Sequence, residues 1–353
     1  MKIKAKEFGV CLSRVLPLCR KQTTLPILTC VLVQAAKGSV RVTGTDIDAF
    51  AAATCDCEDD LEPICVDAVA LNYLVHQAEG DVVLIKGERG CLVETDKGNA
   101  MLGIQPGAEY PPWPSQKSTA LGINTTDLAQ CIKNVEWAAT APDRFNPDMW
   151  KESVWVRMTA KTMECCGTNS KEFAYVKMAA VCAPGEFLFP AKSANLFVEA
   201  LQTGANSVHL SESWIATVGD RFEVAIKLTD EKYIPVEYLV NQDQQPLGKL
   251  DLPALLDSLH TIRALGHNEP WIPVHIEFSR DGIVIRSCEQ KNHFERTLPG
   301  RFEKKHKINV DALRAIKVFS HVKPEATAGI GSASLMFQDG DYTYALALMA
   351  GRQ

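Results

Sequence analysis

The feature that most constrains this fold is a pattern of apolar residues that occurs three times along the chain. In each occurrence, apolar side chains stand at positions i, i+4 and i+7, which lie on one face of a helix. The three stripes, about 120 residues apart, are Phe8, Leu12 and Val15, then Leu128, Ile132 and Val135, then Leu255, Leu259 and Ile262. Recurrence at a nearly fixed displacement predicts a chain built from three similar units.

A second helix is expected in each unit. Residues 66–80 form an amphipathic segment with Asp67 in its first turn and Gly80 after its end, and residues 189–204 and 310–323 repeat it. Between and after the helices, apolar and polar residues alternate, which predicts strands that close in hairpins. The expected hairpin turns are Lys97-Gly98, Gly219-Asp220 and Asp339-Gly340.

The stretch GTNSKEFAYVKM, residues 167–178, begins like a phosphate-binding loop. The stretch GTDIDAF, residues 44–50, has the same skeleton 123 residues earlier, and neither ends in Lys-Ser/Thr before a helix. A stretch present in more than one unit is first of all a structural element. We therefore interpret residues 167–178 as a strand end and a turn.

These patterns predict an α+β fold with three domains, at residues 1–117, 118–245 and 246–353. Linkers are expected at 111–119 and 241–249, which are polar and rich in Pro, Gln or Ser. The helices are expected on one side of antiparallel sheets, because each helix has one apolar face. Three similar units in a row have unlike ends, so contacts between copies run head to tail and give either a ring or a filament.

The composition is that of an ordinary globular protein, with 46% hydrophobic and 23% charged residues. The net charge of −6 argues against a protein that coats nucleic acid over its whole surface, but it allows a local basic face. No apolar run approaches the roughly 18–20 residues of a membrane span. The first residues, MKIKAKEFGV, lack the apolar core of a signal peptide. We therefore expect a cytoplasmic protein without membrane contact.

No metal, cofactor or catalytic residue is expected. The 12 cysteines are scattered without a CxxC pair or a nearby histidine pair, so they do not form a zinc site and are expected as buried thiols. The sequence has no G-x-S-x-G, no glycine-rich dinucleotide loop and no H-E-x-x-H. An enzyme is therefore the main alternative class rather than the preferred one, and detectable turnover would favour it.

Several stretches together resemble the bacterial DNA polymerase III beta subunit, the sliding clamp. They are TTLPILTCVLVQAAKGSVRVTGTDIDAF, GIQPGAEYPPWP, ECCGTNSKEFAYVKM, FLFPAKSANLFVEAL and VGDRFEVAIKLTDEKYIPVEYL. The resemblance covers essentially the whole chain and weakens in the third domain. It implies a head-to-tail homodimer with six domains in a ring, with helices around a central hole. Double-stranded DNA would thread the hole without base specificity, which needs only Lys and Arg facing phosphates.

The six expected helices carry a small positive net charge, in contrast to the chain as a whole. With the resemblance, this charge implies DNA contacts by Arg14, Arg20, Lys21, Lys133, Lys192, Arg263, Arg314 and Lys317, and by Trp150 in a loop that aligns near the DNA. Each basic residue alone is equally typical of a solvated helix face, and Trp150 is equally typical of an aromatic residue packed at the start of a strand. Gln22 and Leu239 stand where the family often has basic residues, which weakens the expectation of DNA contact there.

The resemblance also implies a hydrophobic groove between the second and third domains. In the family, this groove takes short linear peptides from DNA polymerase and clamp-loader subunits. The residues carried over to it are Thr168, Ser170, Lys171, Phe173, Pro235, Val240, Leu346, Leu348 and Met349. Glu172 replaces a commonly basic residue, and the ending YALALMAGRQ departs from the family, so the peptide preference is expected to differ. The alternative is that these residues only pack between domains.

Leu102 and Leu265 align near the family's dimer interface. A second alternative to the clamp is a clamp-like scaffold or regulator that binds peptides but does not encircle DNA. Replacing the basic helix residues would leave the activity of such a scaffold unchanged, whereas the loading or sliding of a clamp would suffer.

Overall fold

The computed structural model describes residues 1–19, 23–115, 117–139, 149–266, 269, 271–287 and 293–349. Contacts divide the chain into two compact units, which we describe separately. The first unit comprises residues 1–130, 181–183 and 193–228, and the second comprises 131–180, 184–192 and 229–353.

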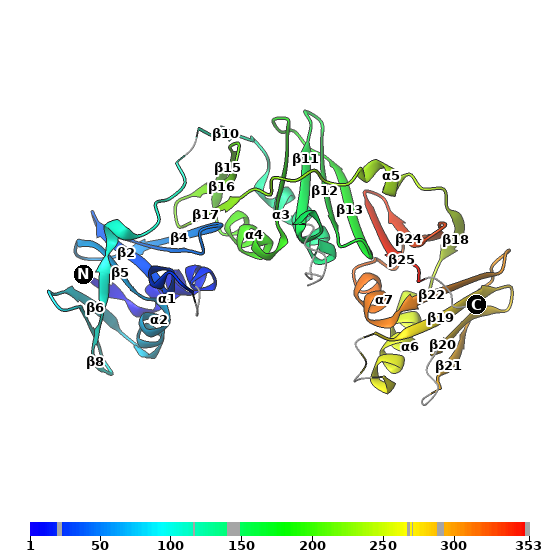
Figure 1. Ribbon diagram of the computed structural model, residues 1–353, viewed down its shortest axis with the longest axis horizontal. Coiled ribbons are helices and arrows are strands. Elements are labelled where there is room, and N and C mark those ends of the chain that lie inside the picture. The colour runs from blue at the N-terminus through cyan, green and yellow to red at the C-terminus, as the bar shows by residue number, and fades with distance from the viewer. Residues whose placement is uncertain are drawn as a thin grey trace. The chain divides into compact units, whose positions relative to one another are not determined.

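Two antiparallel sheets form the framework of the first unit. Its strands are β1 Lys2–Lys4, β2 Cys30–Ala36, β3 Ser39–Thr45, β4 Ala49–Asp56, β5 Leu61–Asp67, β6 Asp81–Lys86, β7 Cys91–Thr95, β8 Gly98–Leu102, β9 Ile104–Pro106, β10 Thr119–Ala120, β15 Ala205–Leu210, β16 Trp214–Gly219 and β17 Phe222–Lys227. The larger sheet has the order β10-β15-β16-β17-β4-β3-β2-β5-β9, and the smaller has the order β1-β6-β7-β8 (Figure 1).

Helices pack against the larger sheet of the first unit. They are α1 Ala5–Val15, α2 Ala68–Gln77 and α4 Ala194–Gln202, with 3-10 turns η1 Leu16–Leu18, η2 Pro26–Thr29 and η3 Gly107–Glu109. Helix α1 contacts α2 and strands β3 and β4, and α4 contacts β15, β16 and β17. Phe8, Leu12 and Val15 of α1 are fully buried, so the predicted stripe is confirmed.

The second unit also contains two antiparallel sheets. Its strands are β11 Ser153–Met158, β12 Thr162–Thr168, β13 Glu172–Ala179, β14 Gly185–Pro190, β18 Gln245–Lys249, β19 Pro273–Ser279, β20 Gly282–Ser287, β21 Glu295–Leu298, β22 His306–Asp311, β23 Thr327–Ile330, β24 Ser334–Asp339 and β25 Tyr342–Ala347. The orders are β14-β11-β12-β13-β25-β24-β23-β18 and β21-β20-β19-β22.

The helices of the second unit are α5 Val236–Val240, α6 Leu252–Leu265 and α7 Ala312–Phe319, with 3-10 turns η4 Glu136–Ala139 and η5 Met149–Glu152. Helix α3 Thr125–Val135 begins in the first unit and ends in the second, and the 3-10 turn η6 Ala191–Ser193 likewise crosses from the second unit into the first. Asp67, Asp251 and Asp311 cap α2, α6 and α7, because each carboxylate accepts a backbone N–H three residues on. The stripes of α3 and α6 are buried as predicted.

The stretches at 44–50 and 167–178 contain the same turn. Thr45 Oγ1 donates to the carbonyl of Ala49 at 2.7 Å, and Thr168 Oγ1 donates to the carbonyl of Glu172 at 2.6 Å. The residue two positions after each threonine has a positive φ, 79° at Ile47 and 71° at Ser170. The interpretation of this stretch as a repeated turn is confirmed.

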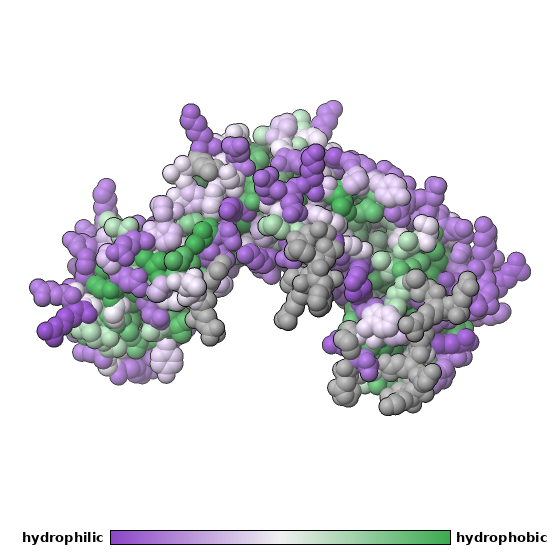
Figure 2. Space-filling model, in the orientation of Figure 1, coloured by the Kyte–Doolittle hydropathy of each residue, from purple (hydrophilic) through white to green (hydrophobic). Residues whose placement is uncertain are grey.

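The α+β class with antiparallel sheets is also confirmed. The sheets, however, continue across the predicted domain boundaries, because β17 pairs with β4 and β13 pairs with β25. Each compact unit thus holds strands from more than one repeat, and the boundaries near 117 and 245 remain predictions from the repeat. On the face shown in Figure 2, each unit presents hydrophilic side chains together with smaller apolar areas. No helix in the described part of the chain is long and apolar enough to cross a membrane.

Candidate functional site

A groove of about 310 Å³ opens on the second unit where the turn after β12 meets β24, β25 and the segment around α5. Its wall is formed by Trp150, Thr168, Ser170, Lys171, Glu172, Phe173, Ile234, Leu239, Gln242, Ala333, Ser334, Met336, Ala345 and Ala347. Most of these side chains are apolar, and Ser170, Lys171 and Gln242 supply polar edges. Such a lining suits an extended peptide with a few apolar anchors.

The floor of the groove belongs to a buried apolar cluster. Phe173, Met336 and Ala345 are at most 8% exposed and pack with Trp155 and Tyr233. The Tyr233 ring stacks on Trp155 at 5.9 Å between centroids. Burial raises the pKa of Tyr233, so its hydroxyl stays protonated and donates to the carbonyl of Cys166 at 3.4 Å.

Trp150 forms one side of the groove. Its ring meets Tyr233 edge-on at 6.1 Å, and its backbone N–H donates to Glu231 Oε2 at 3.0 Å. The ammonium of Lys151 lies 5.3 Å from the centre of the Trp150 ring. The structure places Trp150 in the wall of this groove, and the DNA contact predicted for it from the resemblance remains a prediction.

A charged pair lies beside the groove. Glu172 is 5% exposed, and its Oε2 accepts from Lys317 Nζ at 2.6 Å and from Asn169 Nδ2 at 3.2 Å. A buried carboxylate is tolerated when it is paired and hydrogen-bonded in this way. The pair joins α7, which carries Lys317, to the turn that forms the groove wall. Lys317 pairs with Glu172 in this structure, and its predicted contact with DNA remains a prediction.

Four of the nine residues predicted for the groove line it, namely Thr168, Ser170, Lys171 and Phe173. The other five are outside its wall: Pro235 is exposed, Val240, Leu348 and Met349 are partly buried, and Leu346 is fully buried. Leu346 is on the opposite face of β25 from Ala345 and Ala347, since successive strand residues alternate. Val240 borders a neighbouring cavity of about 650 Å³. Their roles in peptide binding remain predictions.

The predicted DNA contacts are distributed over several helices. Lys133, Lys192 and Arg263 are exposed on α3, η6 and α6, and Arg314 is partly buried on α7. Arg14 of α1 pairs with Glu199 Oε1 at 3.2 Å. Arg20, Lys21 and Gln22 lie outside the described residues. The positions on helices are as predicted, but the interaction of any of these residues with DNA remains a prediction.

Of the two residues predicted for a dimer interface, Leu102 lies on an edge strand and Leu265 at the end of a helix. Leu102 is partly buried in β8, an edge strand of the sheet β1-β6-β7-β8. Leu265 ends α6 and is 39% exposed. Strand β8 also presents Met101, which is 60% exposed. An edge strand has unpaired backbone donors and acceptors that a strand of another chain can use.

The sequence did not identify Ile234, Gln242 or the β24 residues Ser334 and Met336 as part of the groove. Leu239 was noted only as a departure from a basic position, although it lines the groove. The alternating pattern of β24 predicts a strand, but only the pairing of β24 with β25 brings its residues to the groove. The signal for these residues is therefore the sheet order and not a local motif.

No protein-family model matches the sequence, and no curated protein does. Among solved structures, the DNA polymerase III subunit beta from Pseudomonas aeruginosa has a TM-score of 0.88 at 17% identity, covering 99% of this chain and 100% of that one. The P. aeruginosa sliding clamp bound to griselimycin has a TM-score of 0.89 at 17% identity, covering 99% of each chain. The Caulobacter crescentus pol III beta has a TM-score of 0.87 at 14% identity, covering 99% of each chain.

These scores extend over nearly the full length of each chain, so the similarity includes the order of all the elements. At 12 to 17% identity, the common feature is the arrangement of the backbone. The resemblance seen in the sequence is thus confirmed at the level of architecture: the chain has the fold of the DNA polymerase III beta sliding clamps.

Proposed function

We propose that this protein is a DNA sliding clamp, a non-catalytic processivity factor of a DNA polymerase that works in the cytoplasm. Two copies would join head to tail and enclose double-stranded DNA in a ring of six domains. The observation that carries this proposal is the match to sliding clamps across 99% of the chain. A partial clamp-like domain would not have reproduced all the elements in order.

The edge strands support the closure of a ring. Strand β8 ends one sheet of the first unit, and β21 ends one sheet of the second. Pairing of β8 in one copy with β21 in another would satisfy backbone groups on both edges, and Met101 and Leu102 would be covered. Such a contact joins different surfaces of two copies, which is the head-to-tail type that closes a ring when the rotation allows it.

The charges on the helices suit contact with DNA that is independent of base sequence. Lys133, Lys192 and Arg263 are exposed on different helices, and long flexible cations can follow phosphates without reading bases. The ring would hold DNA by enclosure, so tight individual contacts are not required. This agrees with the overall negative charge of the chain.

The groove on the second unit would tether the polymerase and the clamp loader. Its apolar floor and its polar edge at Ser170 and Lys171 suit a short linear peptide. Binding by a peptide segment leaves the rest of the partner free to move along DNA with the ring. Peptides selected from a random linear library against the purified protein would serve as probes for this groove.

The decisive experiment combines light scattering with retention on DNA. We expect a dimer in solution and, with a matching clamp loader, protein that stays on nicked circular DNA and leaves after the circle is cut. A dimer that is not retained on circles would leave a DNA-independent scaffold. A monomer without retention would contradict the ring altogether.

One observation favours the scaffold as a second candidate. Two residues predicted to contact DNA, Arg14 and Lys317, form ion pairs with Glu199 and Glu172. A scaffold of this kind would bind the selected peptides but show no topological retention. Replacement of Lys133, Lys192 and Arg263 together by alanine separates the candidates, because it weakens retention by a clamp and changes nothing in a scaffold.

A further inference from the structure

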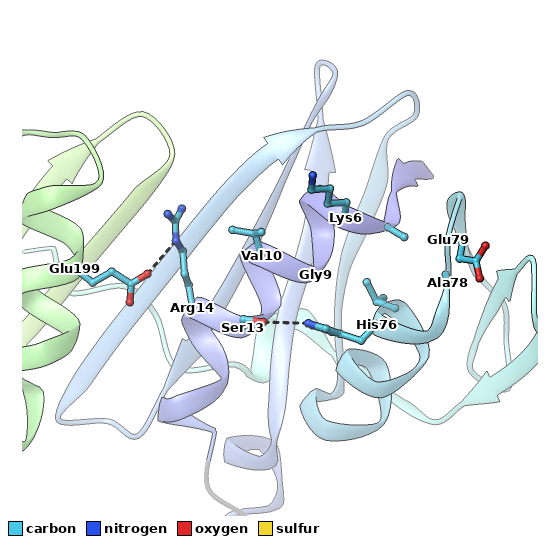
Figure 3. Close-up of a pocket in the computed structure, with 11 residues that line it drawn as sticks. Lys6, Gly9, Val10, Ser13, Arg14, His76, Ala78, Glu79 and Glu199 are labelled. Atoms are coloured by element: carbon cyan, nitrogen blue, oxygen red, sulfur yellow. Dashed lines mark hydrogen bonds and ion pairs between the residues drawn. The ribbon is translucent and has the colours of Figure 1, made fainter.

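One cavity of about 690 Å³ lies among the helices of the first unit, between α1 and α2 with α4 at one end (Figure 3). Its charged side chains include Arg14, which pairs with Glu199. Because α1 and α2 belong to the helices that the clamp proposal turns toward DNA, this cavity adds no separate site. Two other cavities lie on the second unit, and both open on the sheet that contains β13, β24 and β25.

These two cavities, the groove of about 310 Å³ and a second cavity of about 650 Å³, are neighbours on one face of this sheet. Phe173 on β13 pairs with Ala345 on β25, and both line the groove. Two residues away on each strand, Tyr175 pairs with Thr343, and both line the second cavity. Residues two apart on a strand point to the same side, so the two cavities form one trough along the strands.

The end of α5 marks the boundary between the two parts of the trough. Leu239 lines the groove, and the next residue, Val240, lines the second cavity. Both side chains pack on the buried cluster beneath them, which includes Phe173 and Tyr175. The trough therefore continues past the end of α5, and a single extended segment can occupy both parts.

The groove end of the trough has one uncompensated positive charge, on Lys171. This side chain is exposed and has no ion pair with any residue that the structure describes. The next residue, Glu172, already pairs with Lys317 at 2.6 Å. On the tryptophan side of the groove, Lys151 and Glu231 contribute one charge of each sign.

The opposite end of the trough has one uncompensated negative charge, on Asp341, which is exposed and borders the second cavity. Asp341 also has no ion pair within the described part of the chain. The other charges beside this cavity balance. Lys177 pairs with Glu164 at 3.0 Å. Arg157 pairs with Glu164 at 2.7 Å and with Glu237 at 2.6 Å.

Lys171 and Asp341 lie at opposite ends of β25. The carbonyl of Lys171 accepts the N–H of Ala347, the last residue of this strand, at 2.8 Å, and Asp341 directly precedes its first residue. The backbone from Asp341 to Ala347 spans about 20 Å, and an extended peptide of about seven residues covers the same length.

We propose that the trough binds an extended partner peptide that has an acidic residue at Lys171, apolar anchors in the groove and a lysine or arginine at Asp341. The inference rests on the proposed function, because it assigns a charge pattern to the peptides that tether the partners. Opposite charges at the two ends favour a peptide with the matching charge order and disfavour the reversed order. They therefore select the partner and fix the direction in which its peptide lies.

The first test is selection of peptides from a random linear library, followed by calorimetry. The wild type should select sequences with a Lys or Arg about six positions from an Asp or Glu and apolar residues between them. Replacing the basic residue of a selected peptide by Glu should weaken binding about threefold to tenfold at low salt and less at high salt. The same altered peptide should regain affinity for Asp341→Lys. Lys171→Glu should lose the preference for the acidic residue.

Matched controls for these charge reversals are Asp281→Lys and Lys304→Glu. Asp281 is exposed in the turn between β19 and β20, and Lys304 is exposed before β22, so both lie beside the other sheet of the second unit. The controls should select the same peptides as the wild type. If Asp341→Lys and Lys171→Glu also keep the wild-type preference, the inference is overturned, while loss of peptide binding in Trp150→Ala would still support the groove.

The second test locates the basic end of the bound peptide. A benzophenone placed next to the basic residue of a selected peptide should label the segment 338–343 on irradiation, as mapped by mass spectrometry. Labelling confined to residues 168–173 would overturn the inference. If no selected peptide loses affinity in Trp150→Ala, the peptide groove of the proposed function fails and the inference fails with it. The dimer and its retention on DNA test the ring separately.

Discussion

Gly44 and Gly167 occupy equivalent positions in the repeated turn, and each lies against the end of a helix. A Cβ added at Gly44 would stand 2.7 Å from the carbonyl oxygen of Val15 and 3.0 Å from the Val15 Cβ. A Cβ added at Gly167 would overlap the carbonyl of Val135 more severely. The absence of a side chain thus lets the helix approach the strand closely.

We predict that Gly44→Ala and Gly167→Ala each lower the free energy of unfolding by about 2–3 kcal/mol, with the larger loss at Gly167. Overpacking a filled interior costs about 1–3 kcal/mol, and the upper part applies because a backbone carbonyl cannot rotate away. For units of this size, the melting midpoint should fall by about 4–12 °C. Gly80→Ala is the matched control, since no atom lies within 4 Å of a Cβ there.

The assay is urea unfolding followed by tryptophan fluorescence and circular dichroism, with the slope m compared between variants. Gly44 belongs to the first unit and Gly167 to the second. If the units unfold in separate transitions, each substitution should shift only its own. Stabilities within about 0.5 kcal/mol of the wild type would refute the close-approach argument. An equal loss in Gly80→Ala would show instead a general penalty for replacing glycine.

Three further predictions concern the groove, the edge strand and the thiols. Trp150→Ala should weaken binding of a library-selected peptide at least about 30-fold without changing DNA retention. Tyr238 is 73% exposed and lies outside the groove wall, so Tyr238→Ala should leave peptide binding unchanged. Equal peptide affinities of the two variants by calorimetry would exclude Trp150 as an anchor. Met101→Glu should convert the dimer to monomer in light scattering, and an unchanged mass would rule out β8 as the interface. Burial raises the pKa of Cys19 to about 12 in the folded protein. Above about pH 8.5 the thiol of Cys19 therefore loses its proton in the unfolded state but keeps it in the folded state, so the free energy of unfolding falls as pH rises. A urea midpoint at pH 10 equal to that at pH 7 would contradict this, and iodoacetamide should reach the less buried Cys57 before Cys19.

Local patterns predicted the striped helices and the alternating strands, but α5 was not predicted and α2, α4 and α7 begin later than expected. The stripe of α1 and the helix start near Asp67 depend on spacing and on one side chain, which are properties of neighbouring residues, although Asp67 is the N-cap of α2 and not a residue of its first turn. The pairing of β17 with β4 and of β13 with β25 was not predictable in this way. This pairing depends on which sheet edges of neighbouring repeats meet during folding. Strands with similar alternation of apolar and polar residues offer no local signal for that choice.

The same distinction applies to the groove. Thr168, Phe173 and Leu346 were all carried over from the family resemblance, the first two through the repeated turn and Leu346 through the C-terminal strand. A position one residue away on a strand faces the opposite side of the sheet, so Ala345 lines the groove and Leu346 does not. The ion pair of Glu172 with Lys317 joins residues 145 positions apart, and no pattern in the sequence connects them.

The two copies of the turn also suggest why only the second opens into the described groove. In the first unit, the ring of Phe50 is covered by Trp113 at 5.9 Å and by Trp214 at 5.7 Å between centroids. In the second unit, Phe173 corresponds to Phe50, and Ser334, the first residue of β24, corresponds to Trp214, the first residue of β16. A small residue at this position leaves space above the floor of the groove. Ser334→Trp should therefore fill that space and abolish binding of the selected peptides, while light scattering and retention on circular DNA stay unchanged. Peptide binding that survives this substitution would mean that the peptide site lies elsewhere on the protein.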